Sequence, residues 1–142
     1  MIKNDSLTEK IIFCAYKAHT LLGPGFHERI YHEAIKHEFK NEKLEFISER
    51  LFKVRYQNEV VGNLRVDLIV NNCVIVEVKA ITGYIPKVFE SQLLAYLKIS
   101  GLTVGLLINF GNRSCLIRRI VRKENLSKKE VANDMNATIE SP

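Results

Sequence analysis

The sequence predicts an α/β domain in which a mixed β-sheet is flanked by helices, in the order α-α-β-β-β-α-β-β. Two observations support this fold class. Apolar residues recur at helical spacing in the first 41 residues and again from 87 to 100. The remaining segments are short runs rich in Val, Ile and Leu, separated by Asn, Gln and Gly, which is typical of strands joined by turns.

The first 41 residues predict two helices packed as a hairpin. Residues 7–22 have the apolar spacing of a helix, and Ser6 with Glu9 matches a capping box at its start. A Gly-Pro-Gly break follows at residues 23–25. The second helix is expected over residues 26–41.

The rest of the chain predicts three strands, a third helix and two further strands. Pro86 favours a helix start and Gly101 a helix end, and a Gly111-Asn112 turn joins the last two strands. We expect strands at 51–56, 60–70 and 73–80, a helix at 87–100, and strands at 104–110 and 114–121.

The domain organisation is expected to be simple. Residues 1–122 contain neither an internal repeat nor a linker, so they predict one domain. Residues 123–142 are polar and predict a flexible C-terminal tail, with a short helix capped by Ser127.

Burial predicts the register of the central hairpin. A two-residue turn would mix polar and apolar side chains on each face, whereas a three-residue turn pairs Val70 with Val74 and Asp67 with Glu77. The second register places Arg65, Asp67, Glu77 and Lys79 on one face. The other face is then wholly apolar, with Leu64, Val66, Leu68, Val70, Val74, Val76, Val78 and Ala80.

Two carboxylates opposite each other on neighbouring strands repel, which destabilises the fold unless a positive charge compensates. A divalent cation between Asp67 and Glu77 is one way to neutralise them. An ion-pair network with Lys79 and Arg65 is the other. The residues alone leave both open.

Composition limits the classes of function. The 142 residues have 21 Lys and Arg against 16 Asp and Glu, a net charge of +5 that suits a polyanionic partner. No apolar run has the length of a signal peptide or a membrane span, so a cytoplasmic location without a membrane partner is expected. The three cysteines are widely separated, which argues against a zinc knuckle or a disulfide scaffold.

Several motifs together resemble one known superfamily. Asp67 followed by Glu77-Val78-Lys79 resembles the Asp…Glu-x-Lys core of the PD-(D/E)xK nucleases. Residues 25–31 are similar to the signature of the GxxExxY proteins, a prokaryotic family assigned to that superfamily, and the later segments 65–70, 76–80 and 105–111 also match it. The resemblance runs from about residue 7 to 121 and implies a restriction-endonuclease-like core.

The resemblance implies metal-dependent hydrolysis of phosphodiester bonds in nucleic acid, with DNA as the expected substrate. Asp67, Glu77, Glu28 and the Val78 carbonyl are the implied metal ligands. These are hard oxygen donors, which suit Mg²⁺ or Mn²⁺.

The same resemblance implies further catalytic residues. Lys79 would hold or deprotonate the attacking water. Gln92 and Tyr96 resemble a Gln-x-x-x-Tyr motif of exonuclease branches and share a helix face. They would position the nucleic-acid backbone or the water.

Each of these residues also has a structural interpretation. A carboxylate such as Glu28 is favoured in the first turn of a helix, and Tyr96 fits a core aromatic residue. Gln92 fits a surface position. The four histidines are interpreted as partly solvated helix residues. The basic residues expected to bind nucleic acid, whose alternative role is to protect sheet edges, are Arg65, Arg113, Arg118, Arg119 and Arg122.

The alternative to an enzyme is a catalytically silent module on a nuclease fold that binds nucleic acid or protein. The small size of the domain favours this alternative, because it leaves little room for elements that recognise a substrate, and a homodimer or a protein partner is then expected to hold the substrate. The presence of every element of the implied metal site argues against it.

Overall fold

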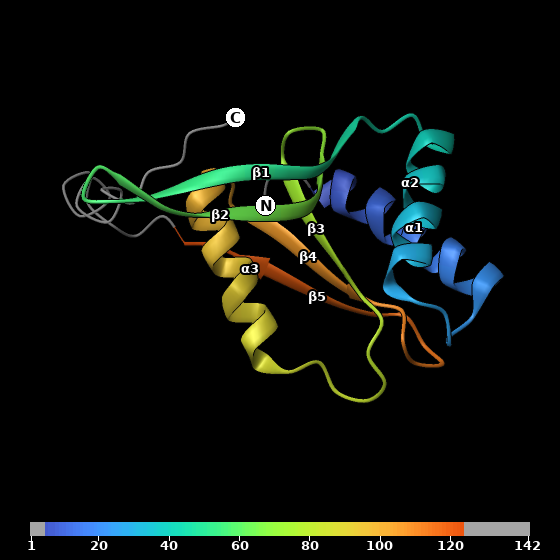
Figure 1. Ribbon diagram of the computed structural model, residues 1–142. Helices are drawn as coiled ribbons and strands as arrows, with labels where there is room; N and C mark the ends of the chain where they lie inside the picture. The colour runs from blue at the N-terminus through green and yellow to red at the C-terminus, as the bar shows by residue number, and fades with distance from the viewer. Residues whose placement is uncertain (1–4, 124–142) are drawn as a thin grey trace.

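The computed structural model describes residues 5–123 and confirms the predicted α/β class and element order (Figure 1). Its five-stranded mixed sheet has the order β1-β2-β3-β4-β5. The elements are α1 (Asp5–Leu22), α2 (Glu28–Asn41), β1 (Phe46–Tyr56), β2 (Glu59–Val70), β3 (Val74–Lys79), α3 (Lys87–Ser100), β4 (Val104–Asn109) and β5 (Leu116–Val121).

One parallel pair makes the sheet mixed. β3 and β4 run parallel because α3 returns the chain across the sheet, whereas β1–β2, β2–β3 and β4–β5 are antiparallel. The boundaries of α3 match the prediction from Pro86 and Gly101, and Gly101 ends the helix with φ +78°.

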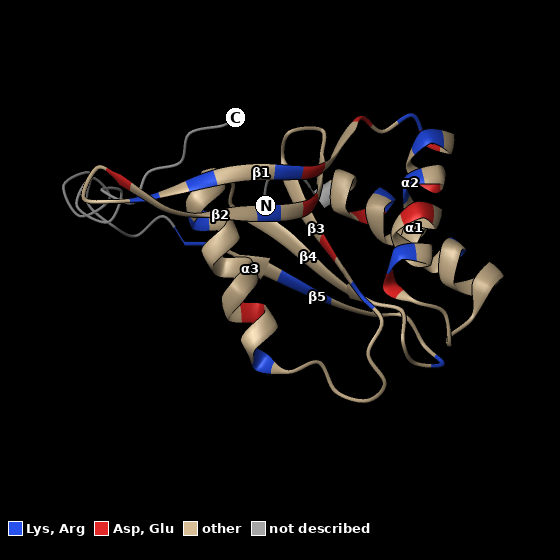
Figure 2. Ribbon diagram, viewed as in Figure 1, with Lys and Arg blue, Asp and Glu red and all other residues tan. Residues whose placement is uncertain are grey.

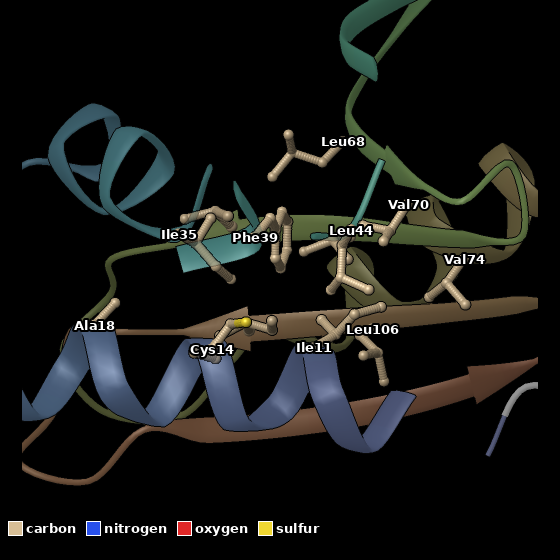
Figure 3. Close-up of a cluster of buried hydrophobic side chains, with 14 of the residues drawn as sticks. Ile11, Cys14, Ala18, Ile35, Phe39, Leu44, Leu68, Val70, Val74 and Leu106 are labelled. Atoms are coloured by element: carbon tan, nitrogen blue, oxygen red, sulfur yellow. The ribbon is translucent and has the colours of Figure 1, made fainter. Parts of the chain in front are cut away.

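The core consists of two layers on opposite faces of the sheet. The first lies under α1 and α2 and contains Ile11, Cys14, Phe39 and Leu106 (Figure 3). The second lies under α3, where Leu93 packs against Gly105 of β4 so closely that a Cβ at Gly105 would lie 2.8 Å from Leu93 Cδ1. Helices therefore cover both faces of the central part of the sheet.

The break between α1 and α2 is held by a buried tyrosine. Tyr31 donates its hydroxyl hydrogen to the Gly23 carbonyl at 2.6 Å and accepts the Phe26 backbone N–H at 3.1 Å. Gly25 has φ +109°, a conformation that favours glycine. Because this turn ends at residue 27, α2 begins at Glu28, two residues later than predicted.

Further predictions about element starts were wrong, including that of the last strand, which begins at Leu116 rather than at residue 114. α1 begins at Asp5, so Ser6 lies inside the helix and does not cap it. β1 begins at Phe46 rather than at residue 51, because Phe46 pairs with Val70 and packs against Phe39. The polar residues 48–50 interrupt the apolar pattern, so the sequence did not indicate the first half of this strand. The predicted C-terminal tail, except Lys123, and the helix capped by Ser127 lie outside the described residues.

The predicted register of the central hairpin is confirmed. Val70 pairs with Val74, and the three-residue turn between them is closed by a hydrogen bond from the Cys73 N–H to the Val70 carbonyl. Asn71 and Asn72 both adopt positive φ, which asparagine tolerates better than most residues.

The predicted continuous apolar face was wrong in one respect. Leu68 and Val70 pack under α1 and α2, but Leu64 and Val66 pack in the α3 layer. The β1–β2 ribbon therefore changes face between Val66 and Leu68. Glu49 of β1, which the register places opposite Asp67, has φ +55° and marks the irregularity. Asp67 thus lies where the ribbon turns over.

No helix in residues 5–123 combines the length and apolar character that crossing a membrane requires.

Candidate active site

Asp67 and Glu77 meet where β2 and β3 separate. The regular backbone pairing of these strands ends at Leu68 and Val76. Beyond it, the Asp67 N–H donates to Glu77 Oε2 at 2.9 Å, and the Val78 N–H donates to Asp67 Oδ2 at 3.0 Å. Each carboxylate therefore takes the place of a backbone acceptor on the neighbouring strand. These bonds use one oxygen of each carboxylate.

Glu77 is the more perturbed of the two acids. Its side chain is only 4% exposed, and burial, with the nearby charge of Asp67, raises the pKa of Glu77 to about 8. The hydrogen bond from the Asp67 N–H and the charge of Lys79 act in the opposite direction without cancelling the effect. At neutral pH the isolated protein therefore favours the protonated form of Glu77.

Lys79 lies two residues after Glu77 at the end of β3. Its Nζ is 4.4 Å from the ring centroid of Phe89 on α3, a cation–π contact that directs the ammonium group. The charge of Lys79 also lowers the pKa of Glu28 and of Glu77 against the larger effect of desolvation. Lys79 therefore acts electrostatically on both carboxyl groups.

α2 contributes a third carboxylate. Glu28 begins this helix, and partial desolvation and the charge of Asp67 raise its pKa. A pocket of about 150 Å³ is lined by Glu28, Arg29, His32, Glu49 and Asp67. The structure therefore brings side chains from α2, β1 and β2 to the place where the ribbon turns over.

Tyr96 approaches the site from α3. Burial, together with the negative charges of Glu77 and Asp67, raises the pKa of its hydroxyl, which therefore stays protonated at neutral pH. Gln92, one turn earlier on the helix, is exposed to solvent. Tyr96 thus packs in the core layer under α3, and Gln92 lies on the helix surface.

Two asparagines fix the loop that follows Lys79. Asn109, paired with Lys79 across the sheet, accepts the backbone N–H groups of Ile81 and Gly111 and donates to the Ile81 carbonyl. Asn112 forms a similar pair of bonds with the backbone of Gly83. A Cβ at Gly111 would lie 2.4 Å from backbone atoms of Ile81, so this position requires glycine.

The predicted basic residues lie on several different parts of the fold, in which Lys and Arg are spread over helices and strands (Figure 2). Arg65 is exposed on β2, two residues before Asp67, while Arg113 lies between β4 and β5. Arg118 and Arg119 are consecutive on β5, so they point to opposite faces of the sheet. Arg122 follows β5. Of the five, Arg65 is the nearest in sequence to the carboxylates.

Sequence reasoning missed four residues beside the site, one of which is Arg29 in the pocket with Glu28. His32 Nε2 lies 3.4 Å from the Asp67 carbonyl oxygen, and its spacing of four residues from Glu28 was an available signal. Glu49 gave no signal, because the strand that contains it was predicted to begin later. Phe89 looked like an ordinary apolar position of α3.

The donor set suits a hard cation, although its members are not gathered as in a preformed metal centre. Within residues 5–123, no three His, Cys, Asp or Glu side chains are grouped closely enough to hold a metal ion. Asp67 and Glu77 nevertheless supply paired carboxylates whose bonds to backbone N–H groups use one oxygen of each. Oxygen donors of this kind match the preference of Mg²⁺ and Mn²⁺.

Comparison with known proteins identifies the family. The family model described as the PD-(D/E)XK nuclease superfamily matches residues 5–121, which include every helix and strand that the structure describes. No curated protein and no solved structure matches the chain. The mixed sheet flanked by helices fits the restriction-endonuclease-like fold expected of this family. The chain therefore belongs to the PD-(D/E)XK nuclease superfamily.

Proposed function

We propose that this protein is a Mg²⁺- or Mn²⁺-dependent nuclease that hydrolyses phosphodiester bonds in DNA. The observation that carries the proposal is the pair formed by Asp67 and Glu77. Each carboxylate is fixed by a backbone N–H of the other strand, and Lys79 follows at once on β3. Family membership makes a nucleic acid the expected substrate.

Asp67, Glu77 and the Val78 carbonyl would hold the cation, with Glu28 as a further ligand from α2. When bound, the ion supplies Lewis-acid polarisation of the phosphate and lowers the pKa of a coordinated water. Glu77 would release its proton as a ligand, because a carboxylate must be ionised to bind a metal. Its raised pKa therefore predicts that metal affinity increases with pH up to about 8.

The other residues would act on the substrate. Lys79, directed by Phe89, would place a positive charge beside the phosphate and stabilise the charge that develops there. The Tyr96 hydroxyl, which stays protonated, would donate a hydrogen bond to the phosphate or to the attacking water. Gln92, at the exposed side of α3, would contact the nucleic-acid backbone.

Within the superfamily, we assign the chain to the GxxExxY proteins. The three signature residues support one structural purpose. Gly25 supplies the positive φ of the turn and Tyr31 holds that turn by two hydrogen bonds, so that Glu28 begins α2 beside Asp67. The signature thus positions a carboxylate.

A second candidate is a catalytically silent nucleic-acid-binding or protein-interaction module on the same fold. Two observations favour it: the absence of a preformed three-ligand group within residues 5–123, and the exposure of Gln92. A homodimer or a protein partner that completes the site would reconcile these observations with an enzyme.

Cleavage by matched variants separates the two candidates. Single- and double-stranded DNA are incubated with wild type, Asp67→Asn and Lys79→Ala in Mg²⁺, Mn²⁺ or EDTA. The nuclease proposal expects cleavage by wild type only with a metal, and at least about a 100-fold loss of rate in both variants, of the size seen when one group that stabilises the transition state is removed. Lys10→Ala, on the exposed surface of α1, serves as the control. Metal-independent cleavage, or equal activity in all four proteins, contradicts the mechanism.

A further inference from the structure

The β1–β2 ribbon extends beyond the rest of the sheet (Figure 1). β2 pairs with β3 only from Leu68 to Val70, whereas its pairing with β1 continues to the far end of both strands, where Tyr56 pairs with Glu59. We name residues 50–65 the β-arm. Apart from Arg65 at its base, neither the family motifs nor the proposed chemistry gives this segment a role.

One face of the β-arm is open to solvent. Phe52 and Leu64 pair with each other and pack in the α3 layer, so they anchor one face near the base of the arm. The pairs Leu51–Arg65 and Lys53–Asn63 lie on the opposite face, and all four of these residues are exposed. Beyond them, every residue from 56 to 63 is exposed.

The β-arm contains a large share of the net charge. It has four basic residues and one acidic residue, so it carries three of the five net positive charges of the whole chain. Lys53 and Arg65 lie on the open face as diagonal neighbours on the two strands. Arg65 is only two residues before Asp67 on β2, so the arm joins the strand that carries one of the two carboxylates.

We propose that the β-arm binds duplex DNA and holds it across the site. The proposal rests on the proposed nuclease function for the choice of a nucleic acid as the partner. From Asp67 to Asn58 at the tip, the ribbon spans nine residues, or about 30 Å. This length is close to one turn of B-DNA, roughly 34–36 Å.

The shape of the arm selects among nucleic acids. The major groove of B-DNA admits a two-stranded ribbon, whereas the major groove of A-form RNA is too deep and narrow. Lys53 and Arg65 would contact phosphates, and Tyr56, Val60 and Val61 at the tip, which are 49–60% exposed, would meet apolar base edges such as thymine methyl groups.

A second copy of the chain is the competing occupant of the arm, because its tip is apolar. Charge disfavours that choice: two arms with the same surplus of positive charge repel when they pair, whereas the phosphates of DNA attract both. The observations therefore favour DNA.

The test measures binding in EDTA, so it requires neither a metal nor cleavage. Fluorescence anisotropy compares a duplex of about 20 base pairs, roughly two helical turns, with single-stranded DNA and duplex RNA of the same sequence. The proteins are wild type, the arm variant Lys53→Gln/Arg65→Gln, and the control Lys10→Gln/Lys40→Gln, which removes the same charge from exposed positions on α1 and α2. Thermal melts show that each protein is folded.

Wild type is expected to bind duplex DNA more tightly than the other two ligands. The arm variant should lose about tenfold in affinity for duplex DNA, and the slope of log K against log[salt] should become shallower by about two, one for each phosphate contact. The control should stay within about twofold of wild type. Preference for single strands or RNA, no binding by wild type, or an equal loss in the control overturns the proposal.

Two further results separate this proposal from its neighbours. Sedimentation that shows a dimer in wild type and a monomer in the arm variant, with unchanged DNA affinity per protomer, assigns the arm to a second copy and overturns the proposal. If the protein binds duplex DNA through the arm but cleaves no DNA, the role of the arm is supported and the nuclease proposal is contradicted. If the arm variant cleaves duplex DNA at the rate of wild type in the presence of metal, the nuclease proposal is supported and the role of the arm is contradicted.

Discussion

Glu77 and Asn109 are polar residues buried on neighbouring strands, yet their surroundings differ. The amide of Asn109 is fully buried and makes three hydrogen bonds to backbone groups of the loop after Lys79 and of Gly111. Glu77, equally close to the core, accepts one backbone N–H and faces the like charge of Asp67. Asn109 is therefore a buried polar group that stabilises the fold, whereas Glu77 is one whose burial lowers the stability of the fold.

The largest expected effect is on the pH dependence of stability in the metal-free protein. The pKa of Glu77 is higher in the folded state than in the unfolded state, so its contribution is fully present below about pH 4.5 and is lost as pH rises toward about 8. The free energy of unfolding should fall by up to about 1.4 kcal/mol per pH unit in that window.

Glu77→Gln removes this titration and supplies the matched control. Urea unfolding of both proteins at several pH values between 5 and 8 measures the difference. Wild type should lose stability relative to the variant as pH rises. If the free energy of unfolding depended on pH in the same way in both proteins, Glu77, like Asn109, would not be held at a cost to stability.

The second effect concerns Asn109 and Asn112, the two asparagines that fix the loop after Lys79. Asn109→Ala should destabilise the protein by about 2–4 kcal/mol, because it leaves part-buried backbone groups of Ile81 and Gly111 without partners. Asn112→Ala removes a similar pair of bonds, but to the exposed backbone of Gly83, so its cost should be below about 1 kcal/mol. Urea unfolding of the two variants tests the ranking, and equal costs would contradict the distinction between buried and exposed polar groups.

The smallest effect is a gain. Asp67→Asn keeps an oxygen to accept the Val78 N–H but removes the charge that faces Glu77, so it should stabilise the metal-free protein by about 1 kcal/mol at pH 8. The gain should shrink toward pH 5, where Glu77 is protonated in both proteins. Thermal melts at the two pH values measure it. A loss of stability at both would show that Asp67 is a structural residue.

Much of the fold was predictable because its signals are local. The helical spacing between Pro86 and Gly101 predicted both ends of α3 to within one residue. The burial pattern alone predicted the pairing of Val70 with Val74. The reversal of the β1–β2 ribbon was not predictable. An alternating pattern does not reveal where a ribbon turns over, and Glu49 carries no sequence sign of its positive φ.

The site was predictable in part for the same reason. The approach of Asp67 to Glu77 follows from strand register, which the apolar pattern determines. The approach of His32 to Asp67, and of Phe89 to Lys79, depends on how α2 and α3 pack on the sheet. Those contacts arise from tertiary packing, and the local spacing of apolar residues in a single sequence does not predict them.

Metal binding tests the central claim most directly. Thermal unfolding of wild type and Asp67→Asn is compared in Mg²⁺, Mn²⁺ and EDTA at pH 8, where Glu77 more readily gives up its proton. The account predicts stabilisation of wild type alone, by about 2.7 kcal/mol at a metal concentration 100 times the dissociation constant. No shift of wild type in either metal, or an equal shift in the variant, would contradict the assignment of the two carboxylates to a metal site.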